Sequence, residues 1–173
     1  MRSLIKNKRG DIPSLIIGLV IILFLVGIVS IVFSKSFLLF TAEFKKQDMI
    51  SNNTNAMNAV NIVESKTIPF LDYLFFFSFI GVLIGLIISS IYINVHPALG
   101  VIFIIFLIVA IVLSGIFANI FVTIGETSEL SSTYNSFVLT KAIVTHLPLI
   151  ILAVGTIIIF VLYGKSKEGV LTA

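Results

Sequence analysis

Four long apolar runs, each without a charged side chain over most or all of its length, constrain this sequence most strongly. An α-helix needs about 20 predominantly apolar residues to cross the hydrocarbon core of a bilayer, and runs of about 18 or more indicate such helices. The predicted spans are residues 12–33, 68–95, 97–124 and 142–163, the second uncharged from Tyr73 onwards. A membrane β-strand needs only about ten residues of alternating polarity. These runs are apolar on every face, so we expect an all-α integral membrane protein with four transmembrane helices.

The composition supports lipid as the solvent for most of the chain. Of the 173 residues, 58% are hydrophobic and 11% are charged, against roughly 45–50% and about 25% in soluble domains. A soluble domain of about 150 residues buries only about 70% of its unfolded surface. The composition therefore excludes a soluble globular domain, a disordered chain and a nucleic-acid-binding module, and it makes the lipid bilayer the first expected partner.

The charges predict an orientation for the four spans. Lys and Arg accumulate on the cytoplasmic side of membrane proteins, and an even number of spans puts both termini on one side. The tails at 1–11 and 164–173 carry six basic and two acidic residues, whereas the segments 34–67 and 125–141, together with Asp72, carry five basic and six acidic ones. We expect both tails inside the membrane-bound compartment, a cell or a virion, and both long segments outside.

The connections between spans differ in length and character. His96 and Pro97 form almost the whole link between spans two and three, which predicts a tight antiparallel helical hairpin, since proline suits a first helical turn. Pro148 either starts span four or kinks it. The acidic, Ser-rich segment 125–141 links spans three and four. No cysteine is present, so disulfides and thiolate sites are excluded.

The outer segment 34–67 is the largest polar region. Phenylalanines at helical spacing near its start suit either an extension of span one or a helix on the membrane surface. Its Asn-rich second half suits a helical return or an irregular polar loop. Asn52-Asn53-Thr54 matches a glycosylation acceptor and makes Asn52 a candidate for modification, although such triplets often arise by chance in Asn-rich sequence. We expect this outer segment to dock a partner.

Small residues at every fourth position predict close helix packing. Span two carries Gly81, Gly85 and Ser89, and span three carries the set Ala110, Ser114 and Ala118. Such stripes form grooves that let another helix approach closely. Counted from the hairpin turn, Gly81 and Ala110 lie at nearly equal depth. The two stripes therefore pack either on each other or on another subunit.

A search for chemistry predicts no catalytic, cofactor or metal site. Ionisable groups deep in a membrane mark functional sites, and no span has one at its centre. Asp72 is interpreted as an interfacial cap at the start of span two, and Asn119 as a helix-packing residue or part of a polar path. His96 and His146 lie on opposite sides of the predicted bilayer, too far apart to share a metal.

Two stretches resemble known proteins. Lys8-Arg9-Gly10 before an apolar run resembles the class III signal of type IV and archaeal pilins, although Leu15 stands where that family has Glu. The order Phe70-Leu71-Asp72-Tyr73, His96-Pro97, an acidic Ser-rich segment with Glu126, Glu129 and Ser131-Ser132-Thr133, Leu147-Pro148 and Leu162-Tyr163-Gly164-Lys165 resembles small multi-span membrane proteins of bacteriophages and archaeal viruses. This second resemblance implies a structural or assembly role in a viral membrane.

Three functions follow as hypotheses. The first is a non-catalytic structural or assembly protein, associated with other membrane or capsid proteins or with itself. The second is an accessory subunit of a cellular membrane enzyme or transporter complex, which predicts co-purification with larger host subunits. The third is a holin-like or small pore, which predicts leakage from liposomes. No span shows the polar stripe that a pore needs, so packing ranks first.

Overall fold

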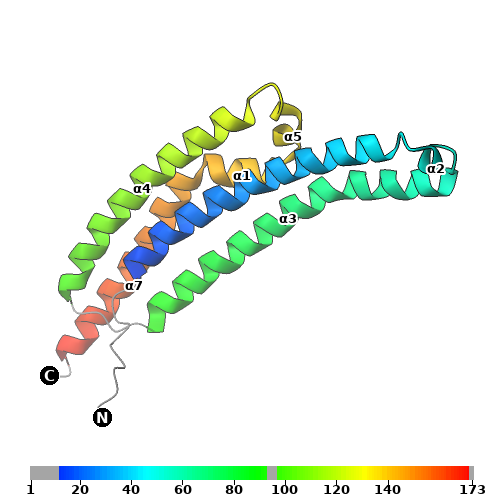
Figure 1. Ribbon diagram of the computed structural model, residues 1–173. Coiled ribbons are helices and arrows are strands. Elements are labelled where there is room, and N and C mark those ends of the chain that lie inside the picture. The colour runs from blue at the N-terminus through cyan, green and yellow to red at the C-terminus, as the bar shows by residue number, and fades with distance from the viewer. Residues whose placement is uncertain (1–11, 93–96, 172–173) are drawn as a thin grey trace, which may run out of the picture.

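The computed structural model describes residues 12–92 and 97–171, and every regular element within those ranges is a helix (Figure 1). The helices are α1 (Ile12–Phe44), α2 (Asp48–Ser51), α3 (Thr54–Tyr92), α4 (Pro97–Gly125), α5 (Ser131–Ser136), α6 (Val138–Thr145) and α7 (Leu147–Leu171). Helices α1, α3, α4 and α7 are each long and apolar enough to cross a membrane. The predicted all-helical fold with four candidate spans is therefore confirmed.

The four long helices form a ring in which consecutive helices are not always neighbours. Helices α1 and α7 each pack against both α3 and α4, whereas α3 and α4 have few direct contacts in the described ranges. Figure 1 shows α3 and α4 on opposite sides of α1 and α7. The predicted tight pairing of spans two and three is thus not what these helices show. Pro97 begins α4, while the rest of the predicted turn, His96 included, lies outside the described residues.

The interior is filled by apolar side chains from all four long helices. Val20 of α1, Phe79 of α3, Phe121 of α4 and Ile158 of α7 are all almost completely buried. Phe24 also stacks on a ring of α4, Phe117, with 4.6 Å between ring centroids. The outward faces are apolar as well, which suits a surrounding of lipid because lipid tails do not drive apolar side chains inward.

The outer segment 34–67 continues the two helices that flank it and is not an independent loop. Helix α1 has 33 residues and α3 has 39, which at about 1.5 Å per residue makes them about 50 and 58 Å long. Both exceed the hydrocarbon core of about 30 Å. Figure 1 shows them running past the ends of α4 and α7. We call residues 34–67 the distal hairpin.

Short-range contacts close the tip of the distal hairpin. Lys45, just after α1, forms an ion pair with Glu64 of α3. Asn53 caps the start of α3, because its Oδ1 accepts hydrogen bonds from the backbone N–H groups of Asn55 and Ala56, both at 3.1 Å. Asn52 is exposed at this tip, where a glycan would have room, and its modification stays a prediction.

The start of the last spanning helix differs from the predicted residue 142. Residues 142–145 belong to α6, and the helix long enough to span begins at Leu147. Pro148 cannot donate a hydrogen bond to the carbonyl of Val144, so α6 ends before His146 and a new helix, α7, begins after it. Of the two predicted roles, Pro148 therefore has the first: it lies in the first turn of α7 and does not kink it.

Candidate functional site

The predicted packing groove of span two lies on the outer face of α3. A Cβ added to Gly81 or Gly85 would meet no atom within 4 Å, and Ser89 is exposed. The opposite face of α3 carries the buried residues Phe79 and Ser90. The expectation that this groove packs span two on span three is therefore wrong within this chain, because α3 and α4 lie across the ring from each other.

The matching stripe on α4 has the opposite environment. Ala110 and Ser114 are fully buried, and Ala118 is nearly so. Because α4 packs chiefly on α1 and α7, this stripe faces those helices and not α3. The Ser114 hydroxyl donates a hydrogen bond to the carbonyl of Ile111 at 2.8 Å. The small side chains thus permit close approach inside the bundle, with the one hydroxyl satisfied locally.

Three other glycines pack tightly against side chains from other helices of the same chain. A Cβ on Gly155 of α7 would overlap the buried side chain of Leu107, and one on Gly125 would overlap the ring of Tyr134. A Cβ on Gly27 would lie 3.2 Å from the ring of Phe121. The structure therefore gives each of these three glycines a close neighbour within the chain.

Asp72 caps a helix other than the one predicted. It lies well inside α3 and is 6% exposed. Its Oδ1 accepts hydrogen bonds from the backbone N and the Oγ1 of Thr140, both at 2.7 Å, and its Oδ2 accepts one from the backbone N of Leu139 at 3.0 Å. These residues form the first turn of α6, whose positive end favours a carboxylate. Asp72 therefore joins α3 to α6 and does not cap its own helix.

Within the described ranges, three buried hydroxyl groups at the same end of the bundle form no hydrogen bond. They belong to Ser34 of α1 and to Thr133 and Tyr134 of α5. The Tyr134 ring packs edge-on against Phe121, and the Lys141 ammonium lies 4.5 Å from its centroid. Burial raises the pKa of the Tyr134 hydroxyl above its ordinary value. The group is therefore a neutral packing element at physiological pH.

The other polar residues singled out by sequence do not assemble into a reactive site. Asn119 is exposed on α4, so it makes no cross-helix contact of the predicted kind. His146 is exposed between α6 and α7, with its Nδ1 2.8 Å from the carbonyl oxygen of Ala142. Within the described parts of the chain, no three His, Cys, Asp or Glu side chains gather as a metal site would require.

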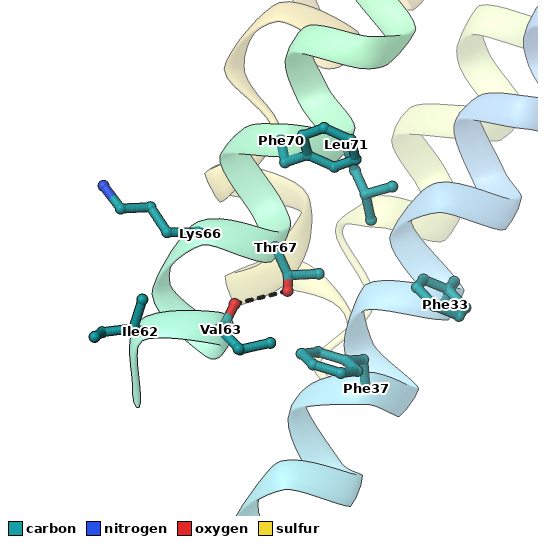
Figure 2. A pocket seen from close by; sticks show the side chains of 8 residues that line it. All are labelled: Phe33, Phe37, Ile62, Val63, Lys66, Thr67, Phe70 and Leu71. Atoms are coloured by element: carbon teal, nitrogen blue, oxygen red, sulfur yellow. Dashed lines mark hydrogen bonds between the residues drawn. The ribbon is translucent and has the colours of Figure 1, made fainter. Parts of the chain in front are cut away.

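An apolar groove runs between α1 and α3 where the distal hairpin begins (Figure 2). It has a volume of about 530 Å³, and its apolar lining consists of Phe33, Phe37, Ile62, Val63, Phe70 and Leu71. Lys66 and Thr67 complete it. Sequence reasoning missed this groove. The helical spacing of phenylalanines marked the α1 side, but no pattern showed which residues of α3 lie opposite.

The comparisons with known proteins returned no match: no family model, no curated protein and no solved structure is similar to this chain. The function is therefore argued from the geometry of the described residues.

Proposed function

We propose that this protein is a non-catalytic integral membrane component that assembles with other membrane proteins through the outer face of α3. The four long apolar helices support the membrane location. The open surface at Gly81 and Gly85 carries the proposal, because no part of the described chain approaches it. The N- and C-terminal tails would lie on the inner side, and the distal hairpin on the outer side.

The contrast among glycines favours a partner helix at this surface. A glycine inside a helix costs about 0.5–1 kcal/mol relative to alanine. Gly27, Gly125 and Gly155 offset that cost through close packing with neighbouring side chains. Gly81 and Gly85 have no such neighbour, although their four-residue spacing is the one that lets two membrane helices approach closely. A second transmembrane helix would supply the missing contacts.

The distal hairpin is the second surface for assembly. Phe40 and Met49 are largely exposed there, at 64% and 83%, beyond the ends of α4 and α7. Contiguous exposed apolar side chains outside a membrane mark interaction surfaces. The resemblance to small viral membrane proteins favours a structural or assembly role in a viral membrane, with a membrane or capsid protein as the partner. A cellular complex would use the same two surfaces.

The experiment compares the partners and the oligomeric state of wild type with those of the double variant Gly81→Leu, Gly85→Leu. The full chain is extracted with a mild detergent, its mass is measured, and the proteins that co-purify are identified. The two leucines fill the groove, so we expect at least a ten-fold loss of association while helix content and thermal stability are kept.

The matched control is Gly18→Leu. Gly18 also has no atom within 4 Å of an added Cβ, but it lies on α1. The control is expected to retain every partner. Unchanged mass and unchanged partners in the double variant would show that α3 does not use this face, and the proposal would fail. Co-purification of larger host subunits in place of viral proteins would overturn only the viral setting.

A further inference from the structure

We infer that the groove between α1 and α3 binds one acyl chain of an anionic phospholipid, with the lipid phosphate held by Lys66. This inference rests on the membrane location proposed above. It assigns a ligand to a surface that plays no part in the packing of α3 on a partner helix.

The interior of the groove matches a hydrocarbon chain. Phe33 and Phe37 form one wall, with 6.4 Å between their stacked ring centroids. The hydroxyl of Thr67 already donates a hydrogen bond to the carbonyl of Val63 at 2.7 Å (Figure 2). A peptide in the groove would bring N–H and C=O groups that need partners. An acyl chain needs none, so the apolar lining favours a lipid over a peptide.

The groove also lies at the depth where an acyl chain meets its headgroup. The uncharged run of α1 ends just after Phe33, and that of α3 ends at Asp72, next to Phe70 and Leu71. Lys66 stands one helical turn beyond Phe70, which is about 6 Å along the axis. Each headgroup region of a bilayer is of similar thickness, about 5–8 Å. Lys66 therefore stands level with the phosphates when Phe70 and Leu71 stand level with the chains, and Ile62 and Val63, about one turn further out, stand level with the headgroups.

The charge of Lys66 is available to a phosphate. Two nearby cations are paired, Lys45 with Glu64 and Lys46 with Glu43, and a third, Lys35, does not line the groove. Among the described residues Lys66 has no such carboxylate partner. Lys66 lines the groove, and Figure 2 shows its side chain extending from α3 away from Phe33 and Phe37, so the ammonium group lies outside the apolar wall. A lysine near an anionic membrane surface contributes about 1 kcal/mol to binding, which is about a five-fold preference for an anionic lipid.

The chain contains no tryptophan, so a single Phe33→Trp substitution places one fluorescent reporter in the groove wall, at the depth of the acyl chains. The full-length variant is reconstituted in phosphatidylcholine vesicles that contain increasing fractions of brominated phosphatidylglycerol or brominated phosphatidylcholine. Bromine quenches a tryptophan that it touches. We expect phosphatidylglycerol to associate about five-fold more strongly than phosphatidylcholine at this position.

Three further variants test the role of Lys66. Lys66→Gln is expected to bring the ratio of the two lipids to about one, and Lys66→Arg to keep it. The matched control is Lys35→Gln, which removes the same charge from α1 between two groove residues, at a position that does not line the groove. A preference that survives Lys66→Gln, or that Lys35→Gln lowers equally, would overturn the site.

A tryptophan at a second position distinguishes failure of the groove proposal from failure of the proposed membrane location. Phe160 of α7 is 73% exposed, and Phe160→Trp should be quenched equally by both lipids. Quenching at position 160 without any lipid preference at position 33 would overturn the groove proposal alone, whereas absence of quenching at both positions would overturn the membrane location. If Phe33→Trp misfolds, Phe70→Trp on the opposite wall, at a site 64% exposed, makes the same measurement.

Discussion

The two faces of α3 have the same apolar character but opposite surroundings. The inner face buries Phe75 and Phe79 against the bundle and holds Asp72 on the first turn of α6. The outer face presents Gly81 and Gly85 to open space. In water such a difference would appear as a polar stripe on the outer face. In lipid both faces are apolar, so apolar residues of α3 are packed in the bundle on the inner face and open on the outer face.

The glycines show the consequence most clearly. In the pairs Gly155–Leu107 and Gly125–Tyr134, the neighbouring helix occupies the volume that a Cβ would need. At Gly81 and Gly85 that volume is empty. The structure therefore separates the glycines that another part of the chain covers from those whose surroundings are open.

The largest expected effect is on the inner face, from Asp72→Ala. It leaves the buried N–H and hydroxyl of Thr140 and the N–H of Leu139 without an acceptor. We expect the free energy of unfolding to fall by about 2–4 kcal/mol, measured by reversible unfolding in mixed micelles. Asp72→Asn keeps one carbonyl acceptor, so its free energy of unfolding should fall clearly less than that of Asp72→Ala. Equal stability of the alanine variant and wild type would mean that the cap does not stabilise the fold.

The next effect comes from adding one methyl group inside the bundle. Gly155→Ala would push its Cβ into Leu107, which is buried and has little room to move. Overpacking of this kind costs about 1–3 kcal/mol. The same unfolding assay measures it, with Gly18→Ala as the control in open space. A stabilised Gly155→Ala variant would contradict the close approach of α4 and α7.

The same methyl group on the outer face should act in the opposite direction. Gly81→Ala and Gly85→Ala meet no atom of the described chain, so each should stabilise the isolated monomer by about 0.5–1 kcal/mol through helix propensity. The measurement is the unfolding free energy at a dilution where the protein is monomeric. Destabilisation there would show that the outer face contacts the chain itself and would remove the contrast between the two faces.

The smallest effect is expected at the buried hydroxyl of Tyr134. Tyr134→Phe removes a hydroxyl that forms no hydrogen bond with the described residues and keeps the ring, so stability at pH 7 should change by less than about 1 kcal/mol.

The pH dependence of Tyr134 has a definite sign. Because burial raises the pKa of Tyr134 in the folded state, the unfolded chain releases the phenolic proton first as pH rises above about 10. The unfolding free energy of wild type then falls with pH relative to that of Tyr134→Phe. Parallel stability curves of the two proteins at alkaline pH would rule out this linkage.

Several features could be predicted from local sequence and others could not. The four candidate spanning helices follow from the length of the apolar runs. The missing N–H of Pro148 left two alternatives for the last helix, a start or a kink, and the structure shows the start. The continuation of α1 and α3 into the distal hairpin was one of two open alternatives, since Phe37 and Phe44 suit either a longer helix or a surface helix. The pairing of Asp72 with Thr140 could not be predicted, because it joins residues 68 positions apart.

The sequence alone determined the fold class: an all-helical chain with four helices long and apolar enough to cross a membrane. It could do so because hydropathy adds along a continuous segment, and the bilayer core requires a minimum length of such a segment. The tertiary structure decided the order of helices around the ring, the partners of the glycines and the groove at Lys66. These depend on which faces meet, and in helices that are apolar on all sides no stripe of polar residues indicates that choice.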